Sequence, residues 1–116
     1  MNAVLLALLL SLPVMVEAHH RTEGRVYHLV TIEGFPNTPA THVCVRGSVT
    51  LVKKEADGDL HVRLEENGKF IVAEQVVGMH VSGKPPKVGE HRKVCGISRY
   101  DKQHGWYEVH PVERWE

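Results

Sequence analysis

Two short turn motifs in the middle of this chain determine which side chains can share a surface. The first is Ala56-Asp57-Gly58-Asp59 and the second is Glu66-Asn67-Gly68-Lys69. Asp-Gly and Asn-Gly between alternating runs predict two-residue hairpin loops, because a type I′ turn needs a positive φ at both central residues. Counting outward from the two turns therefore predicts the register of three consecutive strands.

The predicted register separates an apolar face from a polar one. The predicted pairs are Leu64–Ile71, Val62–Ala73 and His61–Glu74 across the second turn, and Leu51–Leu64 and Lys54–His61 across the first. Alternation along the preceding strand adds Val43, Val45, Gly47 and Val49 to the apolar face. Because two independent turns agree on one core face, the sequence predicts a β-rich barrel or small sandwich.

The same alternation predicts five strands and no major helix beyond the N-terminal segment. The predicted strands are residues 43–55, 60–65, 70–76, 91–99 and 106–112. The connector 77–89 contains two glycines and two prolines before Lys87, so it cannot hold a long helix. Upstream, residues 19–41 are expected to form an N-terminal extension, with an extra strand at 25–32 that covers a barrel end or a sheet edge.

The first eighteen residues are typical of an export signal. Residues 1–16 are apolar apart from Asn2 and Ser11, and Val16-Glu17-Ala18 suits cleavage by signal peptidase. No Lys or Arg precedes the apolar run, so an uncleaved N-terminal anchor is the alternative. We therefore expect a signal peptide at 1–18 and an exported protein, periplasmic or secreted.

Charge and cysteine content narrow the function classes. The 14 basic residues balance the 14 acidic ones, which disfavours a protein that holds nucleic acid mainly by neutralising phosphates. The 2 cysteines, Cys44 and Cys95, are expected to pair if the protein is exported. Two buried free thiols, or a zinc site using both, are the alternatives, although no CxxC motif supports zinc.

The strand pattern resembles the OB-fold. The resemblance rests on a long first strand with Gly47 at its middle, two tight hairpins, a longer connector and a final hairpin, and it covers Val43 to Val112. It implies a five-stranded barrel at 42–116 in which the first strand pairs with the fourth, bringing Cys44 and Cys95 within disulfide reach. The connector lacks the helix that often fills the barrel bottom. The chain also resembles small secreted bacterial single-barrel OB-fold proteins, which have few assigned activities.

One predicted outer face gathers histidines, carboxylates and an aromatic residue. The candidate ligand-binding residues are His61, Arg63, Glu74, Trp106, Glu108 and His110. We expect His61 and Glu74 to pair, Glu108 and His110 to contact a ligand, and Trp106 to stack on it, unless Trp106 belongs to the core. The OB-fold resemblance implies that the ligand side is framed by the loops carrying Asp57/Asp59 and Asp101/His104. The leading hypothesis is an exported protein that binds a small molecule, sugar or oligomeric ligand.

Three alternatives remain at this stage. A metal-dependent hydrolase would use His61, His104, Glu108 and His110 around a zinc-like divalent ion, with Glu108 or Glu74 as general base. A nuclease is suggested by Asp57-Gly58-Asp59 followed by Val62-Arg63-Leu64, which resembles a fragment of the micrococcal-nuclease pattern; the later acid and arginine of that pattern have no counterpart. The third alternative is a structural protein-interaction module whose polar face is an ordinary ion-pair network.

Overall fold

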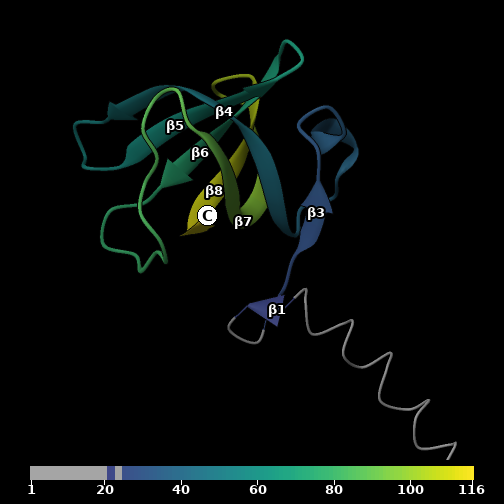
Figure 1. Cartoon of the computed structure of the whole chain (residues 1–116), viewed down its shortest axis with the longest axis horizontal. Helices are drawn as coiled ribbons and strands as arrows, with labels where there is room; N and C mark the ends of the chain where they lie inside the picture. The colour runs from purple at the N-terminus through teal and green to yellow at the C-terminus, as the bar shows by residue number, and fades with distance from the viewer. Residues whose placement is uncertain (1–20, 23–24) are drawn as a thin grey trace, which may run out of the picture.

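The computed structural model describes residues 21–22 and 25–116, and these form strands and loops with one short 3₁₀ turn (Figure 1). The predicted export signal at 1–18 lies outside the described residues. The strands are β1 (Arg21–Thr22), β2 (Arg25–Val26), β3 (His28–Val30), β4 (His42–Lys54), β5 (Leu60–Glu66), β6 (Lys69–Gln75), β7 (His91–Asp101) and β8 (Trp106–Trp115), and the 3₁₀ turn is η1 (Phe35–Asn37). Within the described part of the chain, no helix has the length and apolar character needed to cross a membrane.

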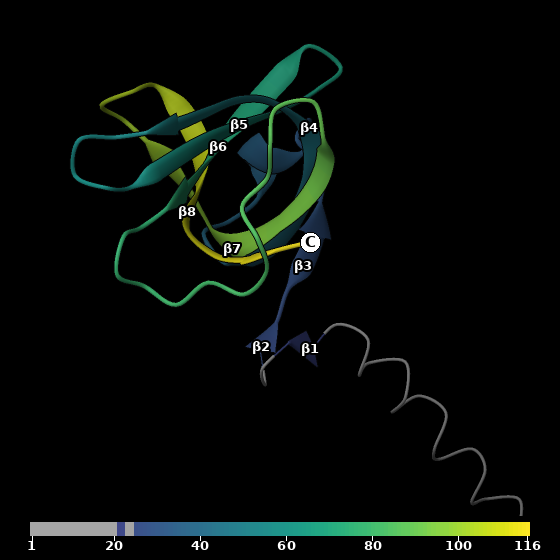
Figure 2. The ribbon, with the colours of Figure 1, turned by 60° about the vertical axis from the view of Figure 1, so that its left-hand side comes forward.

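Five strands close into a barrel in the order β4-β5-β6-β8-β7, with β7 returning to β4 (Figure 2). The long β4 makes closure possible because its first half pairs with β7 and its second half with β5, the change occurring at Ser48. β6 and β8 run parallel, and the other barrel pairs are antiparallel. The predicted all-β barrel is therefore confirmed.

The second predicted turn has the predicted geometry. Asn67 and Gly68 have φ values of 52° and 79°, and Glu66 pairs directly with Lys69. This is the two-residue loop with positive φ at both central positions that Asn-Gly favours. The three strand pairs counted from it, including His61 opposite Glu74, are confirmed.

The first predicted turn is wrong by one residue. The N–H of Glu55 donates to the carbonyl of Asp59 at 2.8 Å, so the loop contains three residues, Ala56 to Gly58. The Gly58 N–H donates to the Glu55 carbonyl and closes a turn over Ala56 and Asp57. Gly58 itself has a φ of 98°, and a turn ending in such a residue is the usual three-residue hairpin loop. As a result, Lys53 lies opposite His61 instead of Lys54.

A bulge at Thr50 overturns a second predicted pair. The β4–β5 register shifts between Val49 and Leu51, so Val49 faces Leu64 while Leu51 faces Arg63. An extra residue reverses the alternation beyond it, and Leu51 is consequently 47% exposed. Before the bulge the predicted alternation holds. Val43, Val45, Gly47 and Val49 are all buried.

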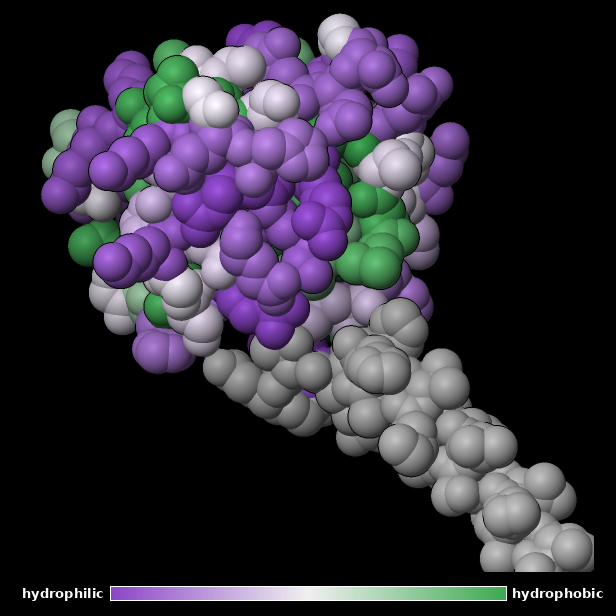
Figure 3. Space-filling model, in the orientation of Figure 1, coloured by the Kyte–Doolittle hydropathy of each residue, from purple (hydrophilic) through white to green (hydrophobic). Residues whose placement is uncertain are grey.

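The N-terminal extension covers a sheet edge and contributes to the core. β3 pairs in parallel with the first half of β4, and Figure 3 shows a hydrophobic patch over β3, where Leu29 is 65% exposed. The following residues enter the barrel: Ile32 and Phe35 are buried in the main core cluster. In Figure 2 this segment is visible through the ring of strands. These two side chains are therefore part of the barrel interior.

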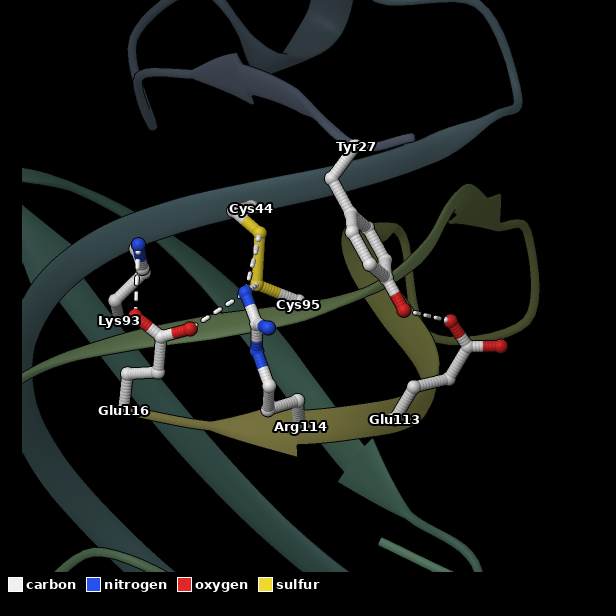
Figure 4. Close-up of a disulfide and its surroundings, with 7 residues drawn as sticks. All are labelled: Tyr27, Cys44, Lys93, Cys95, Glu113, Arg114 and Glu116. Carbon is white, nitrogen blue, oxygen red and sulfur yellow. Dashed lines mark hydrogen bonds and ion pairs between the residues drawn. A yellow bond between two sulfur atoms is a disulfide. The ribbon is translucent and has the colours of Figure 1, made fainter. Parts of the chain in front are cut away.

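A disulfide joins β4 to β7, the two strands whose pairing closes the barrel (Figure 4). Cys44 of β4 lies directly opposite Cys95 of β7, and the predicted disulfide between them is confirmed. Tyr27 forms a small buried cluster with both cysteines. Its hydroxyl donates to Glu113 at 2.8 Å, which holds the ring over the bridge. The Arg114 guanidinium lies 3.5 Å from the Cys95 sulfur.

Candidate functional site

The predicted polar face lies on β5, β6 and β8, between the loop 55–59 and the loop 102–105. Pairing in register places its side chains beside one another: His61 is opposite Glu74, and Val72 of β6 is next to Glu108 of β8. We call the cluster formed by Asp59, His61, Glu74, Glu108 and His110 the acidic cluster. It combines three carboxyl groups with two imidazoles.

Glu108 is the anchor of the acidic cluster and is fully buried. Its Oε2 accepts the indole N–H of Trp106 at 2.7 Å, and its Oε1 accepts the Nε–H of Arg99 at 3.1 Å. The Nδ1 of His110 lies 3.3 Å from the same Oε1. A buried carboxylate needs such donors because burial without partners is costly. The position of Glu108 is therefore set by side chains on both β7 and β8.

Glu74 connects the two histidines. Its Oε1 lies 3.2 Å from the Nε2 of His61 and 3.7 Å from the Nδ1 of His110. Burial, followed by a side-chain hydrogen bond with Asp59, raises the pKa of Glu74. The backbone N–H of Val77, donating to Asp59 at 2.9 Å, is the main cause that lowers the pKa of Asp59. Of these two carboxyl groups, Glu74 therefore has its pKa shifted upward and Asp59 has its pKa shifted downward.

The loop 102–105 is organised by Asp101. Its Oδ1 accepts the N–H groups of Gln103 and His104, and its Oδ2 lies 2.7 Å from the Nδ1 of His104. The hydrogen bond to His104 lowers the pKa of Asp101 to about 2, and the same bond raises the pKa of His104. The His104 ring stacks on Trp106 with centroids 4.5 Å apart, so one face of the indole is covered.

An aromatic row borders the acidic cluster. Phe70 meets Trp106 edge to face at 6.2 Å, and the Arg63 guanidinium lies 3.9 Å from the centre of the Phe70 ring. Arg63 also forms an ion pair with Glu65, with its Nε 2.9 Å from Glu65 Oε2, away from Glu74 and His110. The row therefore places rings and a cation beside the carboxylates, on the same side of the barrel.

Comparison with known proteins identifies the fold. The sequence matches no protein-family model and no curated protein. Among solved structures, the chain is similar to the telomere capping protein Ten1 from Saccharomyces pombe, with a TM-score of 0.53 and 16% identity over 74% of this chain and 78% of that one. The closed five-stranded barrel and this likeness agree. The chain has an OB-fold. At this level of identity the likeness establishes the fold alone.

Ligands of OB-folds are typically bound on the second and third strands between the loops after the first and fourth strands. In this chain those strands are β5 and β6, and those loops are 55–59 and 102–105. Asp59, His61 and Glu74 of the acidic cluster lie on those strands and loops, and Glu108 and His110 lie beside them on β8. Its role in binding stays a prediction, as does the resemblance to secreted bacterial proteins.

The structure separates the predicted site residues into two groups. Glu74, Glu108 and His110 bring one ligand atom each to within 4.8 Å of one another, and Asp101, His104 and Glu108 do the same. His61 borders the first group through Glu74. Trp106 donates a hydrogen bond to Glu108 and stacks against His104, whereas Arg63 pairs with Glu65.

Sequence reasoning missed Arg99, which contacts the buried Glu108. The sequence does contain a signal for this contact, because residues 102–105 form a four-residue loop between Asp101 and Trp106. Counting outward from that loop places Arg99 opposite Glu108, as in the structure. The predicted strand 91–99 ended at this residue, so the pair was not counted. Asp59 was predicted to lie in a loop that frames the ligand side but was not included among the site residues.

Proposed function

We propose that this protein is an OB-fold binding protein that takes a cationic or hydrogen-bond-donating ligand at the acidic cluster. The observation that supports it is the convergence of Asp59, Glu74 and Glu108 on the side of the barrel where OB-folds commonly bind ligands. Three carboxyl groups close together attract positive charge, which an ammonium group or a metal ion supplies, and hydroxyl groups of a neutral ligand can donate hydrogen bonds to them. A phosphate backbone would meet like charge here.

The arrangement of Phe70 and Trp106 argues against binding of single-stranded nucleic acid and favours the cationic or hydrogen-bond-donating ligand. One face of Trp106 is covered by His104, and the face of Phe70 is covered by Arg63. Base stacking on single strands requires exposed ring faces beside a basic groove. The rings of this protein instead pack against its own side chains and border carboxylates.

The test is an amide NMR titration of the full chain in the presence of a metal chelator. The probes are spermidine, a neutral oligosaccharide and a single-stranded oligonucleotide. Spermidine or the oligosaccharide is expected to shift the amide signals of Glu74, Glu108 and His110, and the oligonucleotide is expected to leave them in place. Perturbation by the oligonucleotide alone, or by no probe, would contradict the proposal.

A matched pair of variants makes the titration specific. Glu74→Gln removes a carboxyl group from the acidic cluster, while Glu65→Gln removes one at the far end of the same hairpin, where Glu65 forms an ion pair with Arg63. Ligand affinity should fall in Glu74→Gln and stay unchanged in Glu65→Gln. Equal effects would place binding elsewhere on the barrel.

We also propose that the protein works after export. The Cys44–Cys95 bridge supports this, because disulfides persist in oxidising compartments. The apolar segment 1–16 followed by Val16-Glu17-Ala18 supports it from the sequence. N-terminal sequencing and non-reducing mass spectrometry of the native protein test it. We expect a chain beginning near residue 19 with no free thiol; an intact N-terminus with two free thiols would contradict export.

A further inference from the structure

We propose that Glu74, Glu108 and His110 form a three-ligand site for a divalent transition metal of the zinc type, with at least one coordination position open to an exogenous ligand. The inference rests on the proposed function, since it names a metal as the cation at the centre of the acidic cluster. Nitrogen and oxygen donors in this combination suit zinc, and three protein ligands are characteristic of sites that also bind water or substrate.

The spacing of the ligand atoms fits a single ion. The Nδ1 of His110 is 3.3 Å from Glu108 Oε1 and 3.7 Å from Glu74 Oε1, and one ligand atom from each residue lies within 4.8 Å of the others. In tetrahedral coordination with bonds of about 2.0–2.2 Å, neighbouring ligand atoms are roughly 3.3–3.6 Å apart. Small side-chain adjustments are therefore enough to centre an ion among the three.

The surrounding contacts have the character of an outer coordination layer. Trp106 and Arg99 donate to Glu108, and His61 lies 3.2 Å from Glu74. Metal-binding carboxylates and imidazoles are usually oriented by such partners. The ligands also come from two neighbouring strands, β6 and β8, whose parallel pairing at Val72–Glu108 holds them on a rigid part of the barrel.

The charge of the cluster favours an added cation. Asp59, Glu74 and Glu108 are three carboxyl groups in close proximity, and Glu108 is fully buried. Arg99 supplies one permanent positive charge, on Glu108. Like charges brought together away from water repel strongly. A divalent ion bound between Glu74 and Glu108 would relieve this repulsion.

The second group of ligand atoms, on Asp101, His104 and Glu108, is the weaker candidate. Asp101 already bonds to His104 at 2.7 Å and accepts two backbone N–H groups of its own loop. His104 is half exposed and stacked on Trp106. These contacts hold the loop 102–105 in shape and explain the proximity of the residues without an ion.

The experiment uses the untagged, oxidised full chain after chelator treatment, titrated with Zn²⁺ by calorimetry and with Co²⁺ by visible absorption. We expect one equivalent of metal and a Co²⁺ spectrum typical of low coordination number. His110→Gln and Glu74→Gln should abolish saturable binding, and His61→Gln should weaken it by about 10–100-fold, as loss of an orienting partner does. The control His104→Gln should keep wild-type affinity.

Several results would overturn the inference. These are absence of stoichiometric binding in the wild type, unchanged affinity in His110→Gln, or loss of binding in His104→Gln, which would assign the metal to the other group. If circular dichroism shows that His110→Gln does not fold, the test is ¹⁵N NMR of the histidine rings in the wild type. Zn²⁺ must then shift the resonance of His110 Nδ1, and an unshifted resonance refutes the site. Binding of spermidine or the oligosaccharide by a wild-type protein that takes up no Zn²⁺ or Co²⁺ would refute the metal site and leave the proposed function standing.

Discussion

Trp106 donates its indole N–H to the buried Glu108 carboxylate at 2.7 Å, two residues further along the same strand. Residues at i and i+2 point to the same side of a strand, so β8 places the two side chains together without help from the rest of the fold. Arg99, from the neighbouring strand, then donates to the other carboxylate oxygen. The candidate site is thus assembled around one hydrogen-bonded acid.

Trp106→Phe removes the donor and keeps an aromatic ring. The buried Oε2 of Glu108 then lacks its partner, so we expect the free energy of unfolding to fall by about 1–3 kcal/mol. Urea denaturation followed by circular dichroism measures it. Phe70→Leu, which alters the neighbouring ring without touching Glu108, is the control. A Trp106→Phe midpoint equal to that of the wild type would show that this hydrogen bond contributes nothing to stability.

The Asp101–His104 pair gives a defined pH dependence. The pKa of Asp101 is lowered to about 2, so its stabilising contribution is present above about pH 4 and is lost as the pH falls toward 2. The pKa of His104 is raised by Asp101, with smaller contributions from Glu108 and Glu74, so its contribution is present below about pH 6.5 and is lost as the pH rises through the folded-state pKa.

NMR titration of the His104 ring tests this pair. We expect its midpoint to lie above the ordinary histidine value of about 6.5, and Asp101→Asn should move it down to that range. If the midpoint of His104 is the same in wild type and Asp101→Asn, the carboxylate does not control the protonation of the imidazole.

Tyr27 is expected to protect the Cys44–Cys95 bridge from reduction. Its ring packs on both sulfur-bearing residues, and its hydroxyl bonds to Glu113. Under native conditions Tyr27→Ala should therefore be reduced faster by added dithiothreitol than the wild type, whereas Tyr27→Phe, which keeps the ring, should stay close to it. Timed alkylation and mass spectrometry give the rates. Equal rates in Tyr27→Ala and the wild type would mean that exposure of the bridge is controlled elsewhere.

Removing the bridge itself should be costly. The crosslink joins residues 51 positions apart. By constraining the unfolded chain, a loop of this size contributes about 4 kcal/mol in the chain-entropy description, within a usual range of roughly 2–5 kcal/mol. We expect the double variant Cys44→Ala/Cys95→Ala to lose that much stability in urea denaturation. A loss below about 1 kcal/mol would contradict this expectation.

Gly96 is expected to tolerate substitution less well than Gly47. A Cβ at Gly96 would lie 2.3 Å from the Pro111 carbonyl oxygen, whereas at Gly47 the nearest atom, 2.8 Å away, is the end of the flexible Ile32 side chain. Backbone cannot move aside as a side chain can, so overpacking at Gly96 should cost at least about 1–3 kcal/mol. Urea midpoints of Gly96→Ala and Gly47→Ala compare them directly. The β7–β8 register shifts on both sides of Gly96, and the reverse order would show that this irregular part of the sheet is easily deformed.

Much of the fold followed from local chemistry. Asn67-Gly68 sets the β5–β6 register because only a few residues accept positive φ at both central positions of a turn. The pairs counted from that turn, and the alternation from Val43 to Val49, hold in the structure. The OB-fold pattern gave the partner of the first strand, and with it the disulfide.

The errors came from single inserted residues. Ala56-Asp57-Gly58 forms a three-residue loop, and Thr50 forms a bulge, so Leu51 points to solvent instead of the core. Asp-Gly is compatible with both two- and three-residue loops, and a bulge has no strong local signature. Each insertion changes which face a side chain occupies, so local patterns alone could not place Leu51 or Lys53.

The amino-acid order by itself determined the strands, the Asn-Gly turn and the sharing of one face by Trp106, Glu108 and His110, because these depend on interactions between residues close in the chain. Tertiary structure decided that Glu108 is buried, that Arg99 meets it, and that Ile32 and Phe35 enter the barrel. Those outcomes depend on closure of β4 onto β7 and on the parallel approach of β6 and β8. Contacts between distant segments are set by how the whole barrel packs, which no short stretch of sequence encodes.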